Sequence, residues 1–133
     1  MKTSQLEQII GNANEFDENL VKENGVPDFC HLITELMNKN VISRAELIKR
    51  MTIKADIDRN YGYQLLNGTR APTRTRVIQI GLLLGLDIDE LQRLLKSARK
   101  KPLYVRDLFD ARVFYAVKKK LPIEKAIEFI WNT

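Results

Sequence analysis

The feature that most constrains this chain is a regular series of helix start and stop signals. Small polar residues that cap helix N-termini recur along it, and glycines follow some of them at about one helix length. The start signals are Ser43, Asp58, Thr73 and Asp87, and the stop signals are Gly68 and Gly85. Apolar residues between them recur at three- and four-residue steps, and no segment alternates like a half-buried strand. The sequence therefore predicts an all-α fold with short connections.

Individual signals place the helices. Ser43 and Glu46 have the spacing of a capping box, Pro27 suits a first helical position, and Pro102 bars continuation of the helix before it. The expected helices are Thr3 to about Ala13, Pro27 to about Lys39, Arg44 to about Met51, Arg59 to Asn67, Thr73 to about Leu84, Ile88 to about Arg99, Val105 to about Lys119, and Ile123 to Trp131. The acidic stretch from Asn12 to Asn24 is expected to be a linker or a poorly ordered arm.

These elements divide the chain into three parts. Residues 1–26 form a short helix with an acidic linker, residues 27–100 a central helical domain, and residues 101–133 a C-terminal helical hairpin packed on it. A faint internal repeat supports the last assignment, because residues 78–95 correspond to residues 113–130 and both read as helix, tight turn and helix. Convergent patterning of helical hairpins explains this repeat about as well as duplication does.

Composition limits which cellular compartment and which kinds of chemistry we expect for this protein. No apolar run approaches the roughly 20 residues of a membrane helix, and the N-terminus lacks the apolar region of a signal peptide. A single cysteine, Cys30, excludes an internal disulfide and fits a reducing cytoplasm. Cys30 and His31 have no companion ligands at zinc spacing, so no metal site is expected. With one histidine and one cysteine, we also expect no enzyme activity and no cofactor.

Charge is unevenly spread along the chain. The net charge is +5, yet residues 1–24 hold two lysines and five acidic residues, a net charge of −3. Residues 43–76 hold eight basic and three acidic residues, a net charge of +5. This concentration of positive charge indicates an anionic partner, although a solvated basic surface accounts for it equally well.

The segment "DRNYGYQLLNGTRAPTR", residues 58–74, carries the most informative pattern. Four polar or aromatic side chains share the outward face of its helix at i, i+1, i+4 and i+5 spacing, namely Arg59, Asn60, Tyr63 and Gln64. Arginine can bond guanine bidentately in the DNA major groove, and asparagine or glutamine can do so with adenine. The pattern is therefore typical of a helix that reads base edges, the alternative being an ordinary solvated helix face.

The loop after this helix suits contacts with phosphate. Gly68 lets the chain reverse in a left-handed conformation. Thr69 and Arg70 would then lie beside a sugar-phosphate chain, and Thr73 and Arg74 would begin a helix whose free amide groups attract phosphate. Such contacts set register without reading sequence.

The segments "SRAELIKRM", "RNYGYQLLNGTRAPTR" and "RVIQIGLLLGLDIDELQRLL", in this order and spacing, resemble the phage-repressor-like (Cro/repressor, XRE-type) helix-turn-helix family over roughly residues 27–97. The segment "PLYVRDLFDARVFYAV" is similar to the C-terminal extension of a Firmicute-type, hence bacterial, subset of these regulators. The resemblance implies a lambda-repressor-like helix-turn-helix bundle with a C-terminal helical extension. It also implies phosphate contact by Arg44, base reading by Arg59, Asn60 and Gln64 with Tyr63 beside them, and backbone contact by Asn67, Thr69 and Arg70.

Two positions depart from the family pattern. The turn between the motif helices, "TIKADID", reads as about four residues longer than usual, with Thr52 in place of the turn glycine. Gly62 occupies a position that is normally a buried aliphatic residue. Both departures bear on the tilt of the recognition helix.

Taken together, the residues and the resemblance predict a sequence-specific double-stranded DNA-binding transcriptional regulator that acts as a homodimer. The C-terminal residues Phe114, Phe129, Ile130 and Trp131 are expected either at the dimer interface or in the core. Two alternatives use the same fold. One is a protein–protein interaction module, and the other is an antitoxin or immunity-type regulator that holds a protein partner through its N-terminal arm or C-terminal helices.

Overall fold

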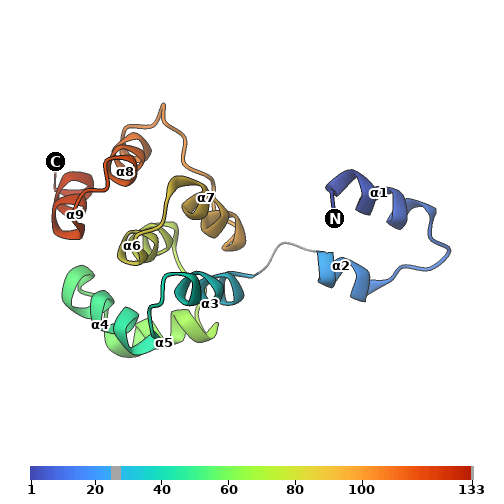
Figure 1. Ribbon diagram of the computed structural model, residues 1–133, viewed down its shortest axis with the longest axis horizontal. Coiled ribbons are helices and arrows are strands. Elements are labelled where there is room, and N and C mark those ends of the chain that lie inside the picture. Colours follow the sequence, from blue (N-terminus) through green and yellow to red (C-terminus); the bar gives the residue numbers. More distant parts are fainter. Residues whose placement is uncertain (25–27, 133) are drawn as a thin grey trace.

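A computed structural model describes residues 1–24 and 28–132. These residues form nine helices and no strand, which confirms the predicted all-α class (Figure 1). The helices are α1 (Thr3–Asn12), α2 (Glu18–Asn24), α3 (Phe29–Lys39), α4 (Arg44–Ala55), α5 (Arg59–Asn67), α6 (Arg74–Leu84), α7 (Ile88–Ser97), α8 (Leu108–Lys118) and α9 (Ile123–Trp131). The helix start expected at Pro27 lies outside the described residues, and Asp28 caps α3 by accepting a hydrogen bond from the His31 amide.

The cap signals of the central helices act as the sequence predicts. The side chains of Asp58, Thr73 and Asp87 each accept a hydrogen bond from the third residue of the helix that follows. Gly68 and Gly85 end α5 and α6 in the left-handed conformation, with φ of 85° and 70°. At Ser43 the described bonds form only half of the predicted capping box, because the Glu46 carboxylate accepts from Arg50 instead.

Three predicted helix boundaries differ from those of the structure. α4 continues one turn past Met51 to Ala55, α7 ends at Ser97, and α8 begins only at Leu108, where Asp107 caps it. The expected linker also contains a helix, α2, whose start is held by amide hydrogen bonds from Asn19 and Leu20 to the Asp17 side chain.

The core is built around α6, which lies within the left-hand group of helices in Figure 1 and contacts α4, α7 and α9. Its Val77, Ile78 and Ile80 side chains are fully buried. Gly81 lets α7 approach α6, since a Cβ placed there would lie 2.6 Å from Cδ1 of the buried Leu91. Close packing of α6 on three sides makes it the scaffold of residues 28–132.

Three helical hairpins share one turn geometry. In α3–α4, α6–α7 and α8–α9, a residue with left-handed φ is followed by an apolar residue whose amide bonds to a carbonyl five residues earlier. These residue pairs are Val41–Ile42, Gly85–Leu86 and Lys120–Leu121, and the carbonyls are those of Met37, Gly81 and Ala116. The repeated helix–turn–helix pattern predicted for the last two hairpins is therefore present, and it extends to the first.

The C-terminal hairpin α8–α9 contacts α4, α6 and α7. Of its four aromatic and aliphatic residues expected at an interface or in the core, Ile130 is buried, while Phe114, Phe129 and Trp131 are half-buried. The Trp131 ring meets Phe109 edge to face at 5.7 Å between centroids. By contrast, α1 and α2 stand apart from the other helices, on the opposite side from α9 (Figure 1).

Gly81→Val is expected to lower the free energy of unfolding by about 1–3 kcal/mol, because the added side chain overpacks the α6–α7 contact. Urea unfolding followed by far-UV circular dichroism measures this. Gly11→Ala is the matched control, since a Cβ at Gly11 meets nothing within 4 Å. Equal unfolding midpoints for the two variants would contradict the close approach at Gly81.

Candidate nucleic-acid interface

Helix α5 presents the predicted base-reading residues at its start. Arg59 and Asn60 are exposed, whereas Tyr63 and Gln64, one turn further, are half-buried. Leu65 and Leu66 on the opposite side are buried in the core. The outward face of α5 is therefore most accessible at its N-terminal end, which is the end that a helix-turn-helix places against base edges.

Gly62 sets how closely α5 lies against α4. It is buried, and a Cβ at this position would lie 3.0 Å from Cδ1 of Ile48 and 3.1 Å from Sδ of Met51. A side chain at this position would require Ile48 or Met51 to shift by a few tenths of an ångström, so the glycine permits the close approach of α5 to α4.

The connection between α4 and α5 is shorter than the sequence predicts. The extra residues of "TIKADID" extend α4 by one turn, with the Thr52 hydroxyl donating to the Ile48 carbonyl at 3.0 Å. Only three residues remain as the turn, and the first of them, Asp56, adopts the left-handed conformation with φ of 52°. Asp is one of the few non-glycine residues that tolerate this conformation. Ile57 then fills the space under the turn, with 1% of its surface exposed.

A shallow apolar groove with basic edges runs between α4 and α5. Its volume is about 290 Å³, and its lining includes Ile48, Ile53, Lys49, Arg59 and Tyr63. The Arg59 guanidinium lies over the Tyr63 ring, 5.8 Å from its centroid, which orients the arginine at the edge of the groove.

The turn after α5 brings further polar groups to the same region. The Asn67 side-chain oxygen accepts a hydrogen bond from the Thr69 amide at 2.9 Å, an arrangement that fixes the turn. Asn67, Thr69, Arg70 and Thr73 are all exposed, although the Thr73 hydroxyl oxygen is engaged as the cap of α6. The Arg70 and Arg76 guanidinium groups each lie over the Tyr61 ring, at 5.6 and 5.7 Å.

Cys30 connects this turn to α3. Its thiol donates to the Leu65 carbonyl at 3.7 Å, and its sulfur lies 3.1 Å from where a Cβ of Gly68 would be. Burial and the nearby Asp28 carboxylate raise the pKa of the Cys30 thiol, while Arg44 opposes them. The thiol therefore acts as a packing group that holds the end of α5 against α3.

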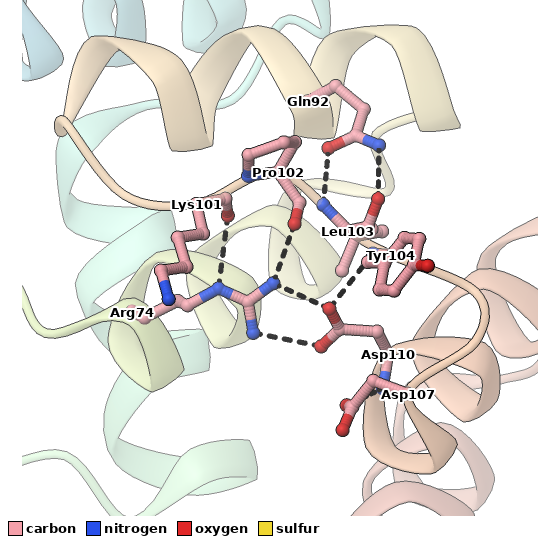
Figure 2. A network of polar contacts seen from close by, with 8 residues as sticks. All are labelled: Arg74, Gln92, Lys101, Pro102, Leu103, Tyr104, Asp107 and Asp110. Carbon is pink, nitrogen blue, oxygen red and sulfur yellow. Dashed lines mark hydrogen bonds and ion pairs between the residues drawn. The ribbon is translucent and has the colours of Figure 1, made fainter.

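Arg74 begins α6 as the sequence predicts, but its side chain is engaged inside the protein. Its guanidinium makes four hydrogen bonds, to the carbonyls of Lys101 and Pro102 and to both carboxylate oxygens of Asp110 (Figure 2). In this arrangement the Arg74 head group donates to internal acceptors rather than being held free for a phosphate.

The same network fastens the connection between α7 and α8. The Gln92 side chain accepts from the Leu103 amide at 2.8 Å and donates to the Leu103 carbonyl at 3.3 Å (Figure 2). Asp110 also accepts from the Tyr104 amide at 2.9 Å. Burial by itself raises the pKa of the Asp110 carboxyl, but the hydrogen bonds from Arg74 and Tyr104 outweigh it and hold this pKa below its usual value.

Seven of the eight basic residues of segment 43–76 fall into two groups, and the eighth, the half-buried Arg76, donates to the Gln79 side chain. Arg50 donates to the Leu83 carbonyl, Lys54 pairs with Glu124 of α9, and Arg74 pairs with Asp110. Arg44, Lys49, Arg59 and Arg70 are exposed, and within residues 1–24 and 28–132 no ion pair involves them. These four, all on α4, α5 or the turn after α5, form what we call the basic face.

Sequence reasoning missed two contributors to this region. Lys49 belongs to the basic face, but it follows Arg44 by five residues, a spacing that does not place two side chains on the same side of a helix, so periodicity gave no signal for it. Tyr61 is the second contributor. It is half-buried and also lies beneath two arginines that are distant from it in sequence, which no local pattern predicts.

Other kinds of site find little support in the part of the chain that the structure describes. No three histidine, cysteine or acidic side chains gather there as a metal site would require. None of its helices has the length and apolar character needed to cross a membrane.

No family model, curated protein or solved structure matches this chain.

Asp110→Asn is expected to lower the free energy of unfolding by about 2–4 kcal/mol near pH 7, because Arg74 keeps its charge while losing its partner. The stabilisation also depends on pH. Since the folded-state pKa of Asp110 is depressed, its contribution is present above the unfolded value of 3.8 and is lost as pH falls through the folded pKa. Between about pH 5 and pH 2 the wild type should therefore lose more stability than the variant.

Urea unfolding at several pH values measures both effects. Asp89→Asn, at an exposed carboxylate in the first turn of α7, is the matched control and should cost no more than about 1 kcal/mol. Parallel pH profiles for Asp110→Asn and the wild type would show that the Arg74–Asp110 pair does not carry this stability.

Proposed function

We propose that this protein is a sequence-specific, double-stranded DNA-binding transcriptional regulator of the phage-repressor-like helix-turn-helix family. In this proposal α4 and α5 are the two motif helices of a lambda-repressor-like bundle, and α8–α9 is its C-terminal extension. Helix α5 lies in the major groove with its N-terminal end toward the bases.

The observation that carries the proposal is the basic face around the exposed start of α5. Its four cations stay available to solvent, while three others nearby are engaged within the protein. Arg59 and Asn60, whose side chains suit guanine and adenine edges, lie at the centre of this face. Gln64, half-buried one turn further, reads a base only if α5 enters the groove deeply.

The roles divide between the helix and its flanks. Arg59, Asn60, Tyr63 and Gln64 are proposed to meet bases, and Arg44, Asn67, Thr69, Arg70 and Thr73 to meet the sugar-phosphate chain, with Lys49 added from the structure. The proposed protein acts in the cytoplasm. It acts as a homodimer, because one recognition helix reads only a few base pairs. The two half-sites would lie about one helical turn of DNA apart.

A second function, binding of a protein partner as an interaction module or antitoxin-type regulator, is favoured by a different surface. Tyr104, Val105 and Leu108, around the start of α8, are each more than half exposed, and Tyr115, two turns further along the helix, is 49% exposed. Large apolar side chains gathered in this way are typical of protein interfaces. Selecting bound fragments from a random pool of duplexes tests the two functions against each other. A regulator yields a shared, palindromic sequence, whereas a protein adaptor yields none.

The salt dependence of binding to a selected duplex provides the next measurement. With four free cations per copy, the logarithm of the affinity is expected to fall against the logarithm of salt concentration with a slope of about −3 to −4 per bound copy. Fluorescence anisotropy over 50–300 mM potassium chloride records this slope. A slope close to zero would mean that the basic face does not contact phosphate.

Two substitutions separate base reading from phosphate contact. Gln64→Ala should cost about 1–3 kcal/mol on the selected duplex and relax discrimination at one base pair. Arg70→Ala should weaken selected and random duplexes by similar factors, because a phosphate contact carries no sequence information.

Anisotropy titrations with both duplexes give these values. Arg93→Ala is the matched control, since Arg93 is an exposed arginine on α7 and lies outside the basic face. If Gln64→Ala and Arg70→Ala changed the ratio of selected to random affinity equally, the assigned roles would be wrong.

A further inference from the structure

Helix α1 has an apolar stripe that the described chain covers only in part, with Leu6 half-buried. Leu6, Ile9 and Ile10 lie at i, i+3 and i+4, which places them on one face of the helix. Ile9 and Ile10 are 43% and 38% exposed, and no residue of α1 is buried. A helix of ten residues is only marginally stable in water by itself, so this stripe needs a surface to pack against.

The folded body offers an apolar groove far from the basic face. It has a volume of about 640 Å³ and lies between the α6–α7 turn and the α8–α9 turn. Its apolar lining is formed by Leu82, Leu86, Ile88, Ala116, Val117 and Leu121. Helix-in-groove recognition uses this combination of a grooved apolar surface and an amphipathic helix with anchors at i, i+3 and i+4.

Charge complements this match. The groove is also lined by Lys118 and Lys120, and Lys119 lies between them in sequence. Its two acidic residues are already engaged, since Glu90 pairs with Lys39 at 2.9 Å and the Asp87 carboxylate caps α7. The N-terminal 24 residues carry a net charge of −3. Of their five acidic residues only Glu7 lies on α1, beside Leu6 at the border of the stripe, and the other four lie between Glu15 and Glu23. The lysine rim therefore favours this acidic N-terminal segment over a basic one.

We infer that two copies of this protein pair by exchanging α1, so that the stripe of each copy lies in the groove of the other. In Figure 1, α1 stands apart from the helices that line its own groove, an arrangement suited to reaching a neighbouring molecule. Reciprocal exchange repeats one contact twice about a two-fold axis, which closes the assembly at a dimer. The inference rests on the proposed function only in that it identifies the surfaces of the proposed homodimer.

The exchange leaves DNA recognition unobstructed. The groove is formed by residues of α6, α7, α8 and the turns that follow α6 and α8, and none of its lining belongs to α4 or α5. Both basic faces of the dimer therefore remain available to a duplex.

Crosslinking between different chains tests the exchange directly. Full-length chains in a Cys30→Ser background carry either Ile9→Cys or Leu121→Cys, and a C-terminal tag on one of them distinguishes the mixed product. Mixing under mild oxidation should give the mixed disulfide at least about five times faster than mixing Ile9→Cys with Val41→Cys. Val41 is 91% exposed and outside the groove, which makes it the matched control.

The double variant, with Ile9→Cys and Leu121→Cys in one chain, shows whether α1 instead folds back on its own groove. Disulfide-linked dimers are expected. Efficient formation of monomers closed by an internal disulfide at high dilution would overturn the exchange, as would equal rates for Leu121→Cys and Val41→Cys in the first experiment.

Analytical ultracentrifugation without DNA gives an independent readout. The wild type should approach twice its 15.4 kDa mass at micromolar concentration. Ile9→Glu combined with Ile10→Glu should raise the dimer dissociation constant at least about tenfold, because two carboxylates would enter an apolar groove. Val41→Glu should leave it unchanged. A monomeric wild type, or equal constants for the two variants, would refute the inference.

These results are separable from the proposed function. A dimer that shows no preference among DNA duplexes would leave the exchange standing and remove the regulator. Sequence-specific DNA binding by a chain that stays monomeric, or that pairs without crosslinking through Leu121→Cys, would leave the regulator standing and remove the exchange.

Discussion

The rest of the described structure depends on the ion pair between Arg74 and Asp110. Arg74 is the first residue of α6, the helix around which the core is built, and Asp110 lies in the first turn of α8. Their bidentate contact, at 2.8 and 2.9 Å, lets Asp110 be buried with 4% of its surface exposed, and the Tyr104 amide donates a further hydrogen bond to the same carboxylate. One guanidinium thereby joins the loop after α5, the centre of the core and the C-terminal hairpin.

This arrangement shows where local sequence signals stop being informative. Asp58, Thr73 and Gly85 act on neighbours within a few residues, so the bounds of α5 and α6 follow from sequence alone. The partner of Arg74 lies 36 residues away and is selected by tertiary packing, so a cationic residue at the start of a helix was assigned to phosphate. The left-handed Asp56 was missed for a related reason, since a buried Ile57 beneath the turn decides that conformation.

Periodicity predicted part of the exposure of α5 but not all of it. Periodicity placed Arg59 and Asn60 on an outward face, and both are exposed. It could not show that Tyr63 and Gln64 would be half covered by the adjoining helix, because coverage depends on how near α4 lies. The division of cations between internal partners and solvent is likewise a three-dimensional property. Because of this division, only four of the cations remain exposed around the start of α5. The proposed DNA binding relies on these four residues.

Gly62 has a consequence for experiments that exchange α5. The glycine lets α5 lie against Ile48 and Met51, so the orientation of α5 is tied to three buried positions. If α5 reads bases as proposed, replacing it with a helix that has an aliphatic residue at this position would shift α5 relative to α4 and displace the side chains proposed to meet bases. Exchanging only the exposed side chains of α5, or trimming Ile48 and Met51 together with the new helix, would avoid this shift.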